Sequence, residues 1–182
     1  LREMETVLLA YSGGVDSTFL LHQCLDVRGR GSVTAVTVDH PMLRNGETEE
    51  ALDLAGKMGA VIERVSVDPL SIPEVAANGP LRCYHCKKGI FSRLREVAEG
   101  KSAVWILEGT NADDATGHRP GIRALEEMGV RSPLLEAGLT KSQIREASRR
   151  VGLPTWSRPS SPCLATRFPY DQPLTEAGLA TV

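Results

Sequence analysis

The stretch LLAYSGGVDSTFLLHQC, residues 8–24, joins an apolar run to an amphipathic run through the short segment SGGVDS. The apolar run predicts a buried strand, and the amphipathic run predicts a helix that follows the segment directly. Glycine is costly to order unless the backbone must approach another group closely, and amides at a helix N-terminus attract anions. The stretch therefore predicts an anion-binding loop. The alternative is a plain tight turn in which Asp16 or Ser17 caps the helix.

Strand-like and helix-like patterns alternate along the rest of the chain. Apolar, β-branched runs predict strands at 6–12, 33–39, 61–68 and 103–110. Helical patterns lie at 16–28, 47–58, 84–99, 119–128 and 140–151. This alternation predicts an α/β fold with a doubly wound, mostly parallel sheet that is buried between helices on both faces. Ligands of such sheets bind at the carboxyl ends of the strands, where Ser12, Asp39 and the segment 109–114 fall.

Composition limits the possible functions. The chain has 182 residues, of which 41% are hydrophobic and 4% aromatic, and its net charge is −2. The near-neutral charge and the few aromatic residues disfavour nucleic acid as a partner. No apolar run reaches membrane-spanning length and no signal peptide opens the chain, so we expect a cytoplasmic protein that does not enter a membrane. Four cysteines without an extracellular signature predict free thiols.

Two regions differ in character. Residues 1–153 carry the alternating pattern, whereas the region 154–182 opens with the irregular, proline-rich stretch PTWSRPSSPCLATRFPYDQP. The final LTEAGLATV starts like a capped helix and then stops. We therefore expect a nucleotide-binding domain over 1–153, followed by a cysteine-bearing segment and the start of a C-terminal region that is otherwise missing.

The loop SGGVDS matches neither the Walker pattern G-x-x-x-x-G-K-[ST] nor the dinucleotide pattern G-x-G-x-x-G. After an apolar strand, it resembles the PP-loop of the ATP pyrophosphatase superfamily. Three later stretches extend the likeness over essentially the whole chain: RCYHCKKGIF (82–91), EGTNADDATGHRPGIRALEEMGVRSPLLEAGLTKSQIR (108–145) and GLPTWSRPSSPCLATRFPY (152–170). Together with the loop, they resemble the ATP-dependent sacrificial sulfur transferases of the LarE type.

The resemblance implies a specific reaction. Such enzymes use ATP and Mg²⁺ to adenylate a carboxylate of pyridinium-3,5-biscarboxylic acid mononucleotide, a precursor of the nickel-pincer cofactor of lactate racemase, and they release pyrophosphate. A cysteine then attacks the acyl-adenylate and AMP leaves. Cleavage of the cysteine Cβ–S bond leaves a thiocarboxylate on the product and dehydroalanine on the protein. The resemblance also implies a homo-oligomer.

The same resemblance assigns roles to residues. It implies that pyrophosphate is held by the loop residues Ser12, Gly13, Gly14, Asp16 and Ser17. Asp16 is the candidate Mg²⁺ contact, because the charge of the leaving group must be neutralised. Asp39 and His40 would lie near adenine and ribose, and Thr110 would help to position ATP. The residues implied for the acceptor are Asn111, Asp114, Arg119, Arg123, Arg158 and Arg167.

Several of these positions have plainer interpretations. Asn111 and its acidic neighbours are equally typical of a helix cap. Arg119 and Arg123 fit a solvated helix face as well as a contact to the mononucleotide. A further run, Arg145, Arg149 and Arg150, has helical spacing and is interpreted as a surface stripe.

Cys163 is the candidate catalytic residue. It lies in SSPCLATR, a proline-bounded loop with Arg158 and Arg167 on either side. Neighbouring guanidinium groups lower the pKa of a thiol and raise its thiolate fraction, so the loop predicts a reactive cysteine. A small buried residue without chemistry is the alternative.

Cys83 and Cys86 form a C-x-x-C pair, which is a weak zinc signal because structural zinc needs two more ligands. It does not open a thioredoxin-like unit, although a redox dithiol is possible. Some LarE-type proteins are thought to hold an iron–sulfur cluster on several cysteines. Here Cys83, Cys86 and Cys163 could ligate three irons and leave one iron free to carry sulfide. The sequence leaves both sulfur sources open, the sacrificed cysteine and the cluster.

Two rival functions keep the same loop. A PP-loop thiolase would transfer sulfur to tRNA, which the near-neutral charge and the few aromatic residues disfavour. A non-catalytic adenine-nucleotide sensor would bind ATP without needing a cysteine in an arginine-flanked loop.

Overall fold

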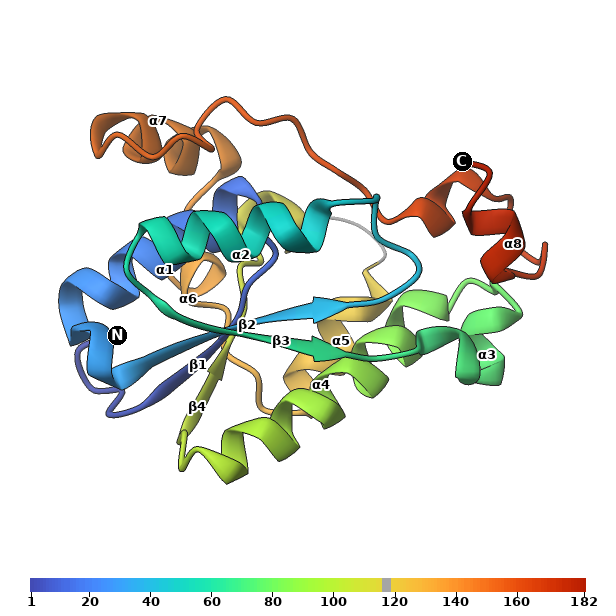
Figure 1. The fold of residues 1–182 in the computed structure, drawn as a ribbon, viewed down its shortest axis with the longest axis horizontal. Coiled ribbons are helices and arrows are strands. Elements are labelled where there is room, and N and C mark those ends of the chain that lie inside the picture. Colours follow the sequence, from blue (N-terminus) through green and yellow to red (C-terminus); the bar gives the residue numbers. More distant parts are fainter. Residues whose placement is uncertain (116–118) are drawn as a thin grey trace.

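The computed structural model of the chain describes residues 1–115 and 119–182. A four-stranded parallel sheet in the order β3-β2-β1-β4 forms its centre (Figure 1). The strands are β1 (Val7–Ala10), β2 (Val33–Asp39), β3 (Val61–Ser66) and β4 (Trp105–Leu107). This arrangement confirms the predicted α/β fold.

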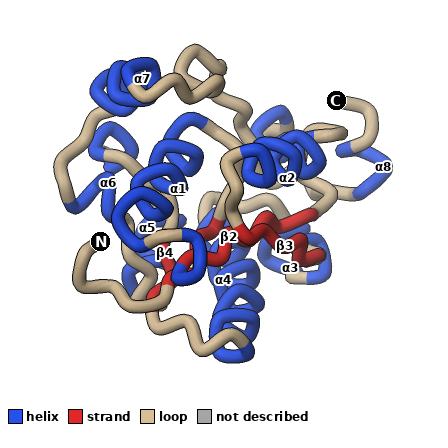
Figure 2. The backbone as a smooth tube through the Cα atoms, turned by 60° about the vertical axis from the view of Figure 1, so that its left-hand side comes forward, coloured by secondary structure: helices blue, strands red, loops and turns tan. Residues whose placement is uncertain are grey.

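Helices lie on both faces of the sheet, as the tube view in Figure 2 shows edge-on. They are α1 (Val15–Arg28), α2 (Glu47–Lys57), α3 (Pro73–Ala76), α4 (Arg82–Gly100), α5 (Pro120–Glu127), α6 (Pro133–Glu136), α7 (Lys141–Arg150) and α8 (Glu176–Leu179). The five longer helices were predicted to within about two residues, the usual uncertainty of helix ends. The four-residue helices α3 and α6 were not predicted.

Alternating residues of the central strand point to two separate cores. Leu9 of β1 packs in a cluster with Phe19 of α1 and Ala51 of α2, and this cluster also reaches α6 and α7. Leu8 packs on the opposite face with Phe91 of α4 and with α5. The period of two along β1 thus determines which helices cover which face.

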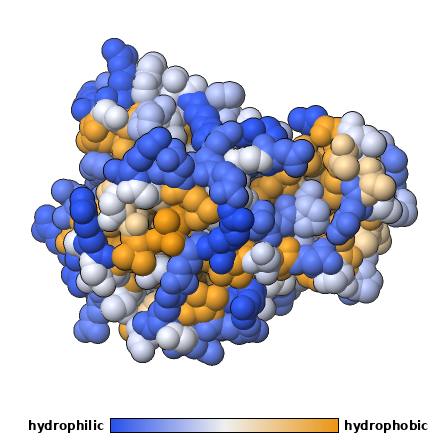
Figure 3. Space-filling model, in the orientation of Figure 1, coloured by the Kyte–Doolittle hydropathy of each residue, from blue (hydrophilic) through white to orange (hydrophobic). Residues whose placement is uncertain are grey.

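Strand β3 is less buried than the sequence predicted. It lies at the edge of the sheet, and Val61 is 51% exposed. Figure 3 shows the resulting apolar band between α2 and α4. Ion pairs of Glu63 with Lys101 and of Arg64 with Glu49 flank the strand. Charged side chains on an edge strand oppose pairing with another chain.

The segment 154–182 packs against the loop after β2 and against α3 through a small core of its own. Leu164, Leu174 and Leu179 bury there against Met42 and Val75. The backbone amide of Leu164 donates to a carbonyl of the loop after β2 at 2.9 Å, and the amide of Leu174 donates to a carbonyl of α3 at 2.8 Å. The cysteine-bearing segment is thereby held beside the carboxyl end of the sheet. None of the described helices has the length and apolarity needed to cross a bilayer.

Candidate active site

The loop SGGVDS connects β1 to α1 and is braced by its own serines. Ser17 Oγ accepts from the amide of Ser12 at 3.3 Å and donates to the carbonyl of Gly14 at 3.3 Å. Ser12 Oγ lies 3.1 Å from Ser17 Oγ. Gly13 has φ +71°, and a Cβ there would lie 3.0 Å from Ala51 Cβ. The loop is therefore held tightly at the N-terminus of α1, where the helix dipole favours an anion.

A cavity of about 310 Å³ opens above this loop, at the carboxyl ends of β1, β2 and β4. Its floor is apolar and includes Val36, Phe91 and Leu94. Its rim is polar and includes Ser12, Ser17, Asp16, Thr110 and Asp114. An apolar floor below a phosphate-binding rim suits a nucleotide whose base is buried and whose phosphates reach the loop.

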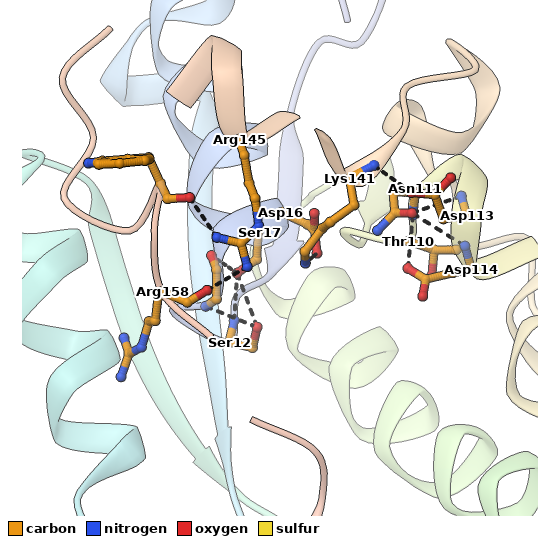
Figure 4. Close-up of polar contacts among 12 residues, drawn as sticks. Ser12, Asp16, Ser17, Thr110, Asn111, Asp113, Asp114, Lys141, Arg145 and Arg158 are labelled. Carbon is orange, nitrogen blue, oxygen red and sulfur yellow. Dashed lines mark hydrogen bonds and ion pairs between the residues drawn. The ribbon is translucent and has the colours of Figure 1, made fainter. Parts of the chain in front are cut away.

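Asp16 stands at the junction of the loop and α7. Its Oδ2 accepts from Lys141 Nζ at 2.5 Å (Figure 4). Its Oδ1 is buried and has no hydrogen-bond partner among the described residues. An unpartnered carboxylate oxygen beside the SGGVDS loop, called the phosphate loop below, fits a Mg²⁺ contact, since oxygen is the ligand that Mg²⁺ prefers.

Lys141 was not among the sequence-predicted site residues. It is the first residue of α7, and its amide donates to Asp113 Oδ2 at 2.8 Å. A capping box formed by Thr140 and Gln143 begins the helix at this point. The capping-box signal places the lysine in the first turn, but nothing in the sequence indicates that this turn faces Asp16.

The end of β4 is organised by Glu108, which is 6% exposed. Its carboxylate accepts from the Thr110 amide at 3.0 Å and from Thr110 Oγ1 at 2.7 Å. Asn111 is 2% exposed, and its Oδ1 accepts from the amides of Asp113 and Asp114 at 2.9 and 3.3 Å. Asn111 thus caps the turn, as the plainer interpretation predicted, while Thr110 and Asp114 line the cavity.

Asp39 and His40 lie at the end of β2 but differ in position. Asp39 accepts from Thr48 Oγ1 at 2.9 Å and borders a separate hollow. His40 borders both this hollow and the cavity above the SGGVDS loop, called the nucleotide-sized cavity below. Burial lowers the pKa of His40 to about 4, and Asp39 opposes that shift. His40 is therefore neutral at physiological pH.

A second cavity, of about 460 Å³, contains three of the four cysteines. Cys83 and Cys86 lie in the first turns of α4, and Cys163 enters from the C-terminal segment. This cysteine cavity shares Ser12, Gly14 and Asp16 with the nucleotide-sized cavity. The phosphate loop and Cys163 therefore face a continuous space. Cys24 is buried in the core beneath α1, as predicted.

Arg158 and Arg167, the sequence neighbours expected to activate Cys163, are not among the groups that lower the pKa of its thiol. Burial raises the pKa of the Cys163 thiol, while a hydrogen bond from the Ala165 amide and the charge of Arg82 lower it in part. Arg158 borders the cavity, but its guanidinium donates to the Gly13 carbonyl at 3.2 Å and pairs with Glu50. Arg167 is exposed. The nearby cation is Arg82, which the sequence reasoning did not single out.

The three cysteines do not form a ready metal site. The pKa of Cys86 is raised to about 12, mainly by burial, with Cys163 and Cys83 adding to the shift. Within the described part of the chain, no group of three or more His, Cys, Asp or Glu is placed to hold a metal ion. The thiols share a cavity, and an iron–sulfur cluster held by them stays a prediction from the sequence.

Arg119 and Arg123 lie outside both cavities. Arg123 is exposed on α5, stacks over the Tyr84 ring at 4.3 Å, and pairs with Glu127 at 3.6 Å. Arg119 is exposed at the start of α5. These placements agree with a solvated helix face.

Arg145 departs from the predicted surface stripe. Its guanidinium donates to the carbonyls of Trp156 and Arg158, at 2.7 and 2.6 Å (Figure 4). Arg149 stacks over the Trp156 ring at 5.6 Å and is exposed, so it behaves as predicted. Arg145 therefore holds the start of the cysteine-bearing segment.

The parallel sheet, the glycine-rich loop and the cavity above it define a nucleotide-binding α/β protein of the PP-loop type. No family model matches the chain. It is 39% identical over 180 residues to the uncharacterised protein slr1717 of Synechocystis, covering 99% of this chain and 67% of the relative. It is 36% identical over 182 residues to pyridinium-3,5-bisthiocarboxylic acid mononucleotide synthase of Lactiplantibacillus plantarum, covering 100% of this chain and 66% of the relative.

A more distant likeness places the chain in the wider superfamily. It is 29% identical over 175 residues to a glutamine-hydrolysing GMP synthase of Ligilactobacillus salivarius, covering 84% of this chain and 33% of the relative. The chain spans about two thirds of the length of the two more similar relatives. It belongs to the LarE-type family of the PP-loop ATP pyrophosphatase superfamily.

Proposed function

We propose that this chain carries out ATP-dependent sulfur transfer to pyridinium-3,5-biscarboxylic acid mononucleotide, in biosynthesis of the nickel-pincer cofactor. The observation that carries the proposal is the shared wall of the two cavities, which brings Cys163 and the phosphate loop to one space. The name of the L. plantarum relative, a pyridinium-3,5-bisthiocarboxylic acid mononucleotide synthase, supports the substrate. A cytoplasmic, homo-oligomeric enzyme remains an expectation from the family resemblance.

The first step is adenylation of the acceptor. A carboxylate oxygen attacks the α-phosphorus of ATP, and the bond from that phosphorus to the bridging oxygen of pyrophosphate breaks. Loop amides at the N-terminus of α1 would hold the departing pyrophosphate. Mg²⁺ on Asp16 would supply charge neutralisation for the leaving group, and Lys141 would supply a second positive charge beside it.

The second step is sulfur transfer. The Cys163 thiol gives up its proton to a base, the resulting thiolate attacks the acyl carbon, and AMP leaves with the electron pair of the broken acyl–oxygen bond. A base then removes the Cα proton of Cys163, the Cβ–S bond breaks, and the electrons of the C–H bond form the double bond of dehydroalanine. The thiocarboxylate departs with the sulfur.

Mass spectrometry of the protein before and after turnover tests this proposal. With ATP, Mg²⁺ and the mononucleotide, we expect a loss of about 34 Da, the mass of H₂S, at Cys163. Cys163→Ala should still release pyrophosphate but form no thiocarboxylate, whereas Cys24→Ala, a change in the core beneath α1, should form both products. Thiocarboxylate formed while Cys163 keeps its mass would refute the sacrificial step. Sulfur appearing in tRNA instead would refute the substrate.

A further inference from the structure

Arg82 is a buried arginine that lacks a carboxylate partner. The residue is 6% exposed, and its Nη1 donates to the carbonyl of Ala165 at 3.0 Å and to Asn78 Oδ1. Its guanidinium also lies over the Tyr170 ring at 5.8 Å from the centroid. Within the described residues, no Asp or Glu lies within ion-pair distance of Arg82. Its Nε and Nη2 make no hydrogen bond to the described residues and are not among the buried unpartnered atoms, so they are open to solvent.

The protein therefore gives this largely buried positive charge only neutral partners. A charge in such a place is less well solvated than the same charge in water, and an anion would stabilise it. Asn78, fully buried with φ +59°, holds the guanidinium in place and donates to the carbonyls of Pro169 and Gln172 at 2.8 and 3.0 Å. The surroundings therefore fix the position of Arg82 without neutralising its charge.

The unneutralised charge borders the cysteine cavity. Arg82 lines this cavity together with the three thiols. The charged residues of the wall are four cations and two carboxylates: Arg82, Lys87, Lys141, Arg158, Asp16 and Glu47. An anion entering the cavity would meet an excess of positive charge, and the fork of N–H groups on a guanidinium matches the geometry of a carboxylate or phosphate.

We propose that Arg82 is an anion receptor in the wall of the cysteine cavity, where its guanidinium binds an oxyanion group of the acceptor. The identity of the acceptor rests on the proposed function, but the anion site itself does not. Bound in this way, the acceptor would be held from the side of Cys163, while the phosphate loop holds ATP from the other side. The anion would also supply the counter-charge that Arg82 lacks.

Calorimetric titration without ATP tests the site. We expect Arg82→Gln to weaken binding of the biscarboxylated mononucleotide by about 10- to 100-fold, the usual range for a lost hydrogen bond to a charged group. Arg82→Lys should recover part of that loss. ATP should bind both variants as it binds the wild type. Arg93→Gln is the matched control, because Arg93 lies on the same helix, is exposed, and pairs with Glu96.

Two related ligands identify the anion. The nucleoside lacking phosphate should show the Arg82→Gln penalty if the site takes a carboxylate, and nicotinamide mononucleotide should show it if the site takes phosphate. Wild-type affinity of Arg82→Gln for the biscarboxylated mononucleotide would overturn the inference. If wild-type protein formed no thiocarboxylate, the proposed function would fail on its own.

A measurement on the wild type decides the matter even if Arg82→Gln does not fold. Isophthalate carries two carboxylates on a six-membered ring, and isophthalamide is its neutral counterpart. Isophthalate should slow alkylation of Cys163 by iodoacetamide, and isophthalamide should not. Equal protection by isophthalate and isophthalamide, or protection by neither isophthalate nor inorganic phosphate, would overturn the inference.

Discussion

Gly13→Ala tests the geometry of the phosphate loop directly. At φ +71°, an alanine would adopt a left-handed conformation, which costs about 1–2 kcal/mol. Its Cβ would also lie 3.0 Å from Ala51 Cβ and 3.2 Å from Ala51 Cα. Overpacking of this kind costs about 1–3 kcal/mol. We therefore expect the free energy of unfolding to fall by about 2–5 kcal/mol, the sum of the two effects.

Gly129→Ala separates the two contributions. Gly129 has φ +65°, similar to that of Gly13, but a Cβ there would meet nothing within 4 Å. We expect this control to lose only the backbone cost of about 1–2 kcal/mol. Equilibrium unfolding in urea, monitored by circular dichroism, measures both losses, and the difference between the two variants gives the steric contribution of Ala51.

The same substitution should weaken ATP binding. The loop relieves the contact when it moves away from α2, and this movement displaces the amides that would hold pyrophosphate. We expect Gly13→Ala to raise the dissociation constant of ATP by at least about tenfold, the loss of one charge-assisted hydrogen bond. Gly129→Ala should bind ATP normally. If both variants lost the same stability and bound ATP equally well, the loop would not be packed as described.

Three further changes test neighbouring parts of the site. Lys141→Met should weaken ATP binding about tenfold, which titration with ATP measures. Its free energy of unfolding should change by less than about 1 kcal/mol in urea, because the ion pair of Lys141 with Asp16 is partly exposed. Arg145→Gln should accelerate proteolysis of the segment after α7, whereas Arg149→Gln should not, and equal rates would contradict the clamp. Since burial lowers the pKa of His40 to about 4, stability should fall as the pH drops below 6.5, where the unfolded chain takes up the proton first. By pH 4 the loss should approach about 3 kcal/mol, and His40→Asn should abolish this dependence in unfolding curves.

The loop could be predicted from sequence because its decisive contacts are local. Ser12 and Ser17 are five residues apart, and they brace the loop between a strand and a helix that the hydrophobic pattern already specifies. The cap formed by Asn111 is equally local, since its partners follow two and three residues later. Parallel strands bring such segments to one edge of the sheet, so the edge that holds the site follows from the strand order.

The long-range partners of the candidate site residues could not be predicted in this way. Asp16 and Lys141 are 125 residues apart, and Arg82 contacts the carbonyl of Ala165 across 83 residues. Arg167 is near Cys163 in sequence but is exposed, so sequence proximity was misleading there. The packing of the C-terminal segment on α3 and α4, and not the order of residues in the sequence, determines that Arg82 rather than Arg167 lies near the Cys163 thiol.

Helix α7 links the two halves of the site more closely than either half alone indicates. Lys141 and Arg145 are four residues apart and lie on the same face of the helix. Lys141 reaches Asp16 of the phosphate loop, while Arg145 holds the carbonyls of Trp156 and Arg158. Arg158 in turn donates to the carbonyl of Gly13, which closes a ring of contacts. Because both contacts come from a single helix, a displacement of α7 would disturb the phosphate loop and the start of the cysteine-bearing segment together.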